Sequence, residues 1–205
     1  MYIYPVTGNS FYKSNRKMKN ITDIEVIESV LKGNQNDFAL LIDRYKNKAF
    51  SMLKRMLRND SDAEEVLQDC FMKAYKALNN FKGDARFSTW FYSIVYNTAL
   101  TKLSSKKRKI ESDMTSIDEH FDIADSSINI SKQFSDSTEL LNKMIEKLPP
   151  SYSTVINLFY MEEMSCEEIS KVMSTSVANV KVMLHRSRSA LKDIIIKKNL
   201  IPELL

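Results

Sequence analysis

Cationic and polar side chains recur at helical spacing in SCEEISKVMSTSVANVKVMLHRSR, residues 165–188. The second part of this segment carries, among apolar residues, Asn179, Lys181, His185, Arg186 and Arg188. Lysine and arginine bind phosphates, and outward side chains on the first turns of a helix reach base edges in the major groove. The pattern therefore predicts duplex DNA recognition, and the alternative is an ordinary solvated face of a helical bundle.

The sequence gives little support for metal binding, cofactor binding or catalysis. The two cysteines, Cys70 and Cys166, lack Cys or His neighbours at ligand spacing, and His120 and His185 stand alone. We therefore expect reduced thiols, no metal and no cofactor. The three glycines form no phosphate-binding loop, and no constellation of His, Cys or carboxylates converges. We identify no catalytic residue and expect no enzyme activity.

The elements that position these side chains are expected to be helices. Among 205 residues there are only 3 Gly and 4 Pro, while long periodic runs consist of helix formers. The fold class is therefore all-α. With 43% hydrophobic and 27% charged residues, the composition is that of a globular protein. The sequence has no long apolar run and no signal peptide pattern, so we expect a cytoplasmic location without membrane insertion.

The segment 23–109 is expected to form one helical domain. Its first stripe is Ile24, Ile27, Val30 and Leu31. The most regular helix, SDAEEVLQDCFMKAYKAL, is predicted to begin at a capping box of Ser61 and Glu64. This helix places Ala63, Val66, Cys70, Phe71 and Ala74 on an inward face, and Glu65, Gln68, Asp69 and Met72 on the other. A loop and a third helix starting near Ser88 follow, and we expect Trp90 to lie in the core.

The remaining chain divides by charge and periodicity. An acidic, Ser-rich linker (110–137) separates a second helical domain (138–198), and the ends are a basic tail (1–22) and a short tail (199–205). In the second domain, Ser165 and Glu168 are predicted to form a capping box and Ser176 is predicted to be an N-cap. Two short helices joined by the polar turn STS are typical of a helix-turn-helix.

Three segments carry a family resemblance. The segment LPPSYSTVINLFYMEEMSCEEISKVMSTSVANVKVMLHRSRSAL resembles the C-terminal DNA-binding domain of bacterial extracytoplasmic-function (ECF) sigma factors. SDAEEVLQDCFMKAYKAL resembles the polymerase-binding helix of that family, and FKGDARFSTWFYSIVYNTAL resembles its promoter-melting loop and −10 helix. Together the matches cover about 38–195 in family order.

The resemblance implies a function and partners. It implies a region 2 helical bundle and a region 4 helix-turn-helix joined by a flexible acidic linker. It implies a factor that binds core RNA polymerase and directs promoter recognition and melting. The implied contacts on the polymerase are the clamp of the large subunit and the flap of the other large subunit. Promoter DNA and an anti-sigma factor are the further partners implied, and the free chain is expected to be a monomer. The linker would pass through the RNA-exit region.

The resemblance also implies roles for individual residues. The expected polymerase-binding residues are Glu65, Gln68 and Asp69. The expected −10 residues are Lys82, Asp84, Arg86 and Asn97. The expected −35 residues are Asn179, Lys181, Val182, His185, Arg186 and Arg188, with Val182 able to touch a thymine methyl and the two arginines holding phosphate.

The sequence departs from the family at Ser93, Tyr96 and Met183, where the family is often basic. These departures predict weaker binding to the DNA phosphates at both promoter elements. They also leave open a sigma-like protein without melting competence. A stand-alone helix-turn-helix regulator is the other alternative, although the polymerase-docking pattern of the N-terminal half argues against it.

Overall fold

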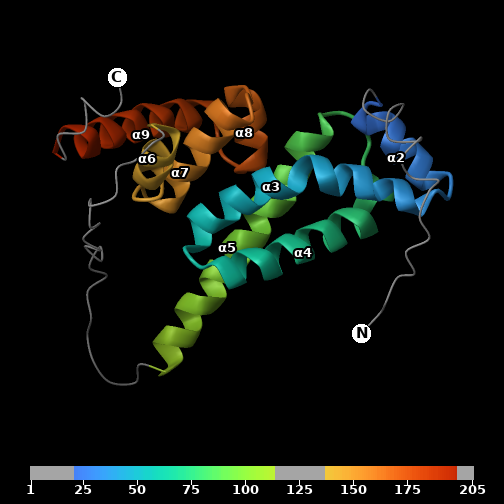
Figure 1. Ribbon diagram of the computed structural model, residues 1–205, viewed down its shortest axis with the longest axis horizontal. Helices are drawn as coiled ribbons and strands as arrows, with labels where there is room; N and C mark the ends of the chain where they lie inside the picture. The colour runs from blue at the N-terminus through green and yellow to red at the C-terminus, as the bar shows by residue number, and fades with distance from the viewer. Residues whose placement is uncertain (1–20, 114–136, 198–205) are drawn as a thin grey trace.

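The computed structural model describes residues 21–113 and 137–197 (Figure 1). Every regular element in this part of the chain is helical, which confirms the predicted all-helical fold. The elements of the N-terminal half are α2 (Asp23–Leu31), η2 (Gln35–Asp37), α3 (Phe38–Leu57), α4 (Asp60–Ala77), η3 (Leu78–Asn80) and α5 (Phe87–Asp113). Those of the C-terminal half are α6 (Ser137–Ile145), α7 (Pro150–Ile156), η4 (Asn157–Met161), α8 (Cys166–Val172) and α9 (Val177–Lys197). The predicted basic tail, acidic linker and C-terminal tail lie almost wholly outside the described residues.

Helix α2 buries a face that matches the predicted one only in part: Ile27 and Val30 are buried as predicted. Val26, Ile27 and Val30 are buried, whereas Ile24 and Leu31 are 56% and 46% exposed. The sequence reasoning was wrong for these two residues because a nine-residue helix is compatible with two overlapping apolar stripes, and only its neighbours decide which one is covered.

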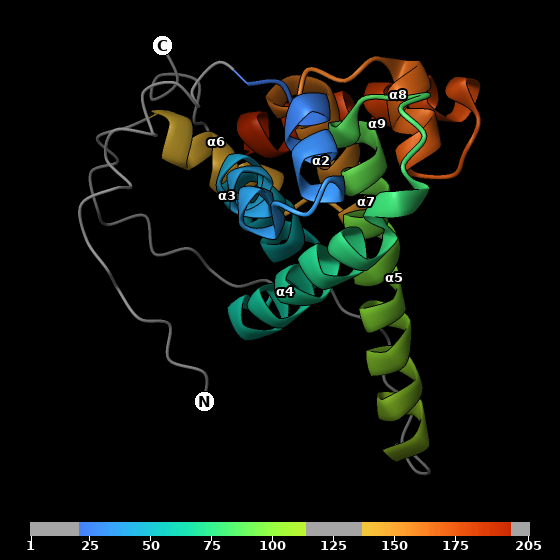
Figure 2. The ribbon, with the colours of Figure 1, turned by 90° about the vertical axis from the view of Figure 1, so that its right-hand side faces the viewer.

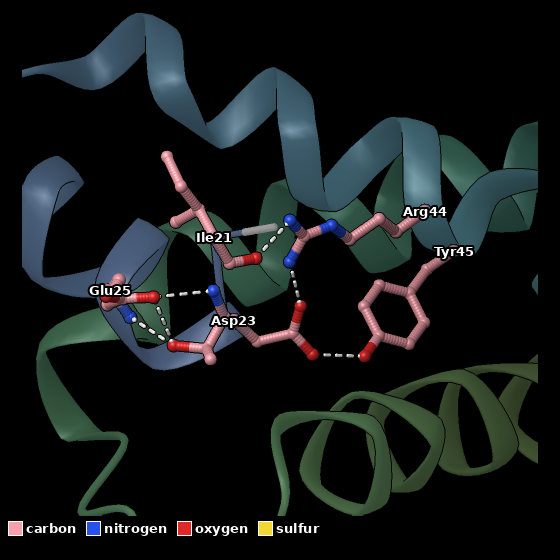
Figure 3. A network of polar contacts seen from close by, with 6 residues as sticks. Ile21, Asp23, Glu25, Arg44 and Tyr45 are labelled. Atoms are coloured by element: carbon pink, nitrogen blue, oxygen red, sulfur yellow. Dashed lines mark hydrogen bonds and ion pairs between the residues drawn. The ribbon is translucent and has the colours of Figure 1, made fainter. Parts of the chain in front are cut away.

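The start of α2 is anchored to α3 through a polar network (Figure 3). Arg44 donates from Nη1 to Asp23 Oδ1 at 2.6 Å and from Nη2 to the carbonyl of Ile21 at 2.5 Å. The Tyr45 hydroxyl donates to the other oxygen of Asp23. Thr22 caps the helix in a capping box with Glu25. The network therefore fixes both the N-terminus of α2 and its angle to α3.

Helix α4 begins earlier than predicted. Its N-cap is Asn59, whose side chain accepts from the backbone N–H of Asp62 at 2.9 Å. The prediction of a capping box at Ser61 and Glu64 was therefore wrong. Asn59 has the extended backbone and the short acceptor that an N-cap needs, so the helix is capped two residues before the serine. The inward face is as predicted, with Ala63, Val66, Cys70, Phe71 and Ala74 buried.

The two halves of the chain share one apolar core. Phe87, Phe91 and Tyr92 of α5 belong to the same buried cluster as Met164 and Ile169 of the C-terminal half. Figures 1 and 2 show α7 and α8 packed beside α3 and α5, while the C-terminal part of α5 projects away from the other helices. Among the described helices, none combines the length and the hydrophobicity that a membrane span requires.

Candidate nucleic-acid interface

Helices α8 and α9 form the predicted helix-turn-helix. The capping box at α8 is present: Glu168 N–H donates to Ser165 Oγ at 3.2 Å, and Ser165 N–H donates to Glu168 Oε2 at 2.9 Å. The turn passes through Ser174 at φ 50, a left-handed conformation that ends α8 sharply. Ser176 Oγ then accepts from Asn179 N–H at 3.2 Å, which confirms Ser176 as the cap of α9.

The outward face of α9 is open to solvent. Asn179, Lys181, His185 and Arg186 are exposed, and Val182 is 44% exposed. Lys181, His185 and Arg186 make no ion pair with another described residue. Hydrogen bonds at the start of α8 lower the pKa of Glu167, and Lys181 lowers it further. The face thus offers unpaired cations beside an amide and an apolar side chain, the combination that phosphate and base-edge contacts require.

Arg188 is held differently from the other α9 cations. Its Nε donates to the Tyr160 hydroxyl at 2.8 Å, and its guanidinium lies 5.6 Å from the ring centroids of both Phe159 and Tyr160. Cation–π contact of this kind fixes the side chain against the π-helical turn η4. Arg188 therefore also contributes to packing within the C-terminal half, a role that the sequence pattern did not indicate.

The predicted −10 loop joins η3 to α5. Lys82, Asp84 and Arg86 are exposed, and Gly83 turns the chain at φ 77. The loop is supported by aromatic packing, since the Phe81 ring lies 5.9 Å from Phe87 and 5.4 Å from Trp90. Trp90 packs against the core without being fully buried. The loop backbone is thus held on a rigid aromatic base that leaves its charged side chains accessible.

Asn97 lies apart from the loop, at the edge of an open, solvent-exposed cavity between α4 and α5. The cavity has a volume of about 310 Å³ and is lined by Lys73, Ala77, Ser93, Ile94, Asn97, Thr98 and Thr101. Lys73 Nζ donates to Thr98 Oγ1 at 3.2 Å. None of the loop residues lines it, and Asn97 is about 15 Å along α5 from the loop at about 1.5 Å per residue. The structure therefore divides the predicted −10 residues between two places.

The cavity adds a cation that sequence reasoning missed. Lys73 is one helical turn before Ala77 on α4, and this spacing brings both residues to the side that faces α5. The inward stripe of α4 could have indicated it, because Lys73 lies next to that stripe. Ser93 lines the same cavity, whereas Tyr96 is buried at 9% exposure and burial raises its pKa. Tyr96 is therefore a core residue.

The predicted polymerase-binding residues share an exposed face of α4. Glu65, Gln68 and Asp69 are exposed, and Met72 on the same face is 56% exposed. Glu65 Oε2 accepts from Lys102 Nζ at 2.6 Å, and this hydrogen bond raises the pKa of Lys102. The face places acids and an amide beside an exposed methionine, a residue type that is enriched at protein interfaces.

Two family models match the chain, one in its N-terminal half and one in its C-terminal half. The model described as Sigma-70 region 2 matches residues 41–109. The model described as Sigma-70, region 4 matches residues 138–191. The outward faces of α4 and α9 thus fall in different matched regions.

Characterised proteins match over most of their length. The RNA polymerase sigma-H factor of Pseudomonas aeruginosa is 32% identical over 176 residues, which is 82% of this chain and 91% of that protein. The ECF RNA polymerase sigma-E factor of Escherichia coli K12 is 33% identical over 182 residues, which is 85% of this chain and 95% of that protein.

Solved structures share the fold. CnrH in complex with the cytosolic domain of CnrY has a TM-score of 0.57 at 22% identity, covering 84% of this chain and 96% of that one. The sigma factor RpoE of Bartonella quintana, solved with the anti-sigma factor NepR, has a TM-score of 0.61 at 16% identity, covering 78% and 96%.

Proposed function

Because the chain belongs to the ECF group of RNA polymerase sigma factors, which direct promoter-specific transcription initiation, we propose specific roles for the surfaces described above. The observation that carries the assignment is the pairing of two surfaces in one chain. The α9 face carries His185 beside Lys181 and Arg186, two cations that form no ion pair with another described residue, and the α4 face of Glu65, Gln68 and Asp69 is exposed. A DNA-reading helix and a protein-docking helix are the two parts that such a factor needs.

The α4 face is proposed to bind core RNA polymerase. Its inward residues fill the core, so a partner can bind the outward acids and amide without loss of packing, and only Glu65 would exchange an existing contact, its hydrogen bond with Lys102. By similarity the partner surface is the clamp of the polymerase large subunit. Met72, at the C-terminal end of this face, adds an exposed apolar side chain that a partner could contact. Catalysis of RNA synthesis would then belong to the polymerase, and the site of action would be the cytoplasm.

The loop and the cavity are proposed to act together on the −10 element. Lys82 and Arg86 would hold phosphates of the melted strand. Asn97 would contact a base or the strand at the cavity, with Lys73 beside it as a further cation. Unpaired bases gain about 1–3 kcal/mol each from stacking or pocket contacts, which offsets part of the cost of melting. The small Ser93 widens the cavity at the position where the family is often basic.

The α9 face is proposed to read the −35 element. Lys181 and His185 would contact bases in the major groove, and Val182 would touch a thymine methyl. Arg186 would hold phosphate, and Asn179 would contribute near the helix start. Arg188, seated on Phe159 and Tyr160, would present its remaining guanidinium nitrogens to phosphate from a fixed position.

An anti-sigma protein is proposed as the regulatory partner. The Bartonella quintana neighbour was solved with an anti-sigma factor. In the present chain, the exposed Met72 and the α9 face are surfaces that a partner could cover to block docking.

The decisive experiment is run-off transcription from a genomic fragment library with purified core polymerase, with and without the protein. New transcript starts that share −35 and −10 elements are expected, and they would supply the recognition sequence. No new starts, together with duplex binding but no association with core polymerase, would overturn the proposal in favour of a stand-alone DNA-binding regulator.

A further inference from the structure

The turn before α9 holds both the backbone and the side chain of Asn179. The Asn179 backbone N–H donates to Ser176 Oγ at 3.2 Å, which caps the helix. The Asn179 amide Nδ2 donates separately to Thr175 Oγ1 at 2.9 Å. Only the first of these contacts is needed to cap the helix, so the second has the effect of orienting the asparagine side chain.

The residue that orients Asn179 is itself fixed in place. The Thr175 backbone N–H donates to the carbonyl of Ser170 at 3.0 Å, and the preceding Ser174 adopts the left-handed conformation that ends α8. The Thr175 hydroxyl is therefore presented from a backbone that is anchored to α8. A side chain that is already held in one orientation loses less conformational entropy when it binds a ligand.

The rotation of α9 turns Asn179 away from the protein. Val180 and Leu184 are 0% and 4% exposed and belong to the apolar core, whereas Asn179 is exposed. Asn179 is the third residue of α9, and the N-terminal residues of a recognition helix are those that contact base edges in the major groove. The oriented amide therefore lies on the part of α9 that reaches bases.

The hydrogen-bonding groups that remain on this amide match one base. A carboxamide has two N–H donors and one oxygen acceptor, and Thr175 accepts from one of the donors. One N–H donor and the oxygen acceptor remain. In the major groove adenine presents its N7 acceptor beside its N6 donor, and asparagine binds this pair with two hydrogen bonds. Guanine presents two acceptors there, cytosine a donor, and thymine an acceptor and a methyl group, so none of these bases satisfies both remaining groups.

Val182 adds an apolar side chain beside Asn179. It follows Asn179 by three residues, a spacing that makes side chains neighbours on a helix surface, and it is 44% exposed. The thymine methyl group also lies in the major groove. An amide that binds adenine and an apolar side chain that contacts thymine favour the same kind of base pair.

We propose that Asn179 selects an adenine in the −35 element, and that Thr175 is the positioning residue that orients the Asn179 amide for this contact. The inference rests on the proposed function, which places the α9 face in the major groove of the −35 element. Rotation of the amide by half a turn exchanges its oxygen and nitrogen, and the exchanged order does not match adenine. The Thr175 hydroxyl therefore contributes to base selectivity rather than to affinity for DNA in general.

The first test uses a promoter recovered by run-off transcription, with each −35 position changed in turn to the other three bases. Transcription with core polymerase is compared for the wild type, Asn179→Ala, Thr175→Val and Thr175→Ser. At one position, replacing adenine should lower wild-type transcription about fivefold to hundredfold, and Asn179→Ala should reduce this selectivity to less than about twofold. Thr175→Val lacks the hydroxyl and should lower the selectivity at that position alone, about twofold to tenfold. Thr175→Ser keeps the hydroxyl and should retain the selectivity.

Ser170→Ala is the matched control for loss of a hydroxyl in the helix-turn-helix. The Ser170 hydroxyl donates to the carbonyl of Glu167 at 2.7 Å and not to the Asn179 amide, so this variant should keep the wild-type selectivity at every −35 position.

A second template carries 7-deazaadenine at the selected position, which lacks the N7 acceptor but still pairs with thymine. This change should lower transcription by the wild type about twofold to tenfold and leave transcription by Asn179→Ala unchanged. An equal effect on both proteins would show that Asn179 does not bind N7, and would overturn the adenine contact.

The outcomes separate the inference from the proposed function. If the wild type starts transcription but Asn179→Ala weakens all templates equally, Asn179 contacts phosphate and the inference is overturned. If Thr175→Val keeps the wild-type selectivity, or loses transcription equally on every template, the positioning role is overturned. If the wild type starts no transcription from any fragment, the proposed function fails and the inference fails with it.

Discussion

Substitution of Asp23 by alanine tests how strongly the start of α2 depends on its anchor. Asp23 accepts from Arg44 at 2.6 Å and from the Tyr45 hydroxyl, and the Arg44 and Asp23 side chains are 30% and 24% exposed. A charged hydrogen bond at such a partly exposed site contributes about 1–2 kcal/mol after solvent screening. A tyrosine hydroxyl left without its acceptor costs about 1 kcal/mol more. We therefore expect Asp23→Ala to lower the free energy of unfolding by about 2–3 kcal/mol.

The assay is urea unfolding followed by circular dichroism, with thermal unfolding as a second reading. A loss of this size corresponds to a fall in Tm of about 5–10 °C for a chain of this length. Asp43→Ala is the matched control. Asp43 is 67% exposed and, among the described residues, pairs only with Lys46 one turn along α3, so its loss should cost at most about 0.5 kcal/mol. Because Asp23 and Tyr45 share a hydrogen bond, Asp23→Ala and Tyr45→Phe should be less than additive. Additive losses, or an Asp23→Ala loss no larger than that of the control, would refute the reasoning.

The same anchor bears on the DNA-contacting loop. The Tyr45 ring packs edge-on against Phe87 at 5.4 Å, and Phe87 is the first residue of α5 after the loop. Loosening Tyr45 should therefore loosen the aromatic base of the loop as well as α2.

Three further outcomes are expected. Burial and the Asp23 hydrogen bond raise the pKa of Tyr45 above its usual 10.0, so this tyrosine ionises first in the unfolded chain. The free energy of unfolding should therefore fall as pH rises above about 10, by about 1.4 kcal/mol per pH unit for each such tyrosine. Urea unfolding at pH 8–11 should show a smaller fall in this free energy per pH unit for Tyr45→Phe than for the wild type, and an equal fall would contradict the assignment. Iodoacetamide should label the partly exposed Cys166 in the native protein and leave the buried Cys70 unmodified, as peptide mapping would show; equal labelling would mean that α4 does not pack as described. Arg186→Ala should weaken DNA binding similarly for all sequences and reduce the slope of log K against log salt by about 0.9; a change in base preference with an unchanged slope would assign Arg186 to base reading.

Local patterns predicted much of the fold and part of the candidate site. The capping box of Ser165 and Glu168 and the cap at Ser176 depend on residues three apart, so they could be read directly from the chain. The exposed faces of α4 and α9 followed from helical periodicity for the same reason. Asn59 and Ser61 are both residue types that can cap the start of α4, and helical periodicity could not decide which of them does so.

The tertiary structure alone decided which faces meet. Arg55 sits in the last turn of α3, where a cation is expected to be exposed, yet its partners lie 87 and 102 residues along the chain. Lys73 and Asn97 come from two helices whose relative rotation brings them to one cavity. Glu168 was identified as a cap, and only the packing of α8 on α5 showed that it also binds Arg86 and Thr89. Helix formation is governed by neighbours in sequence, whereas the pairing of helix faces depends on shape and charge between distant segments, which no local spacing records.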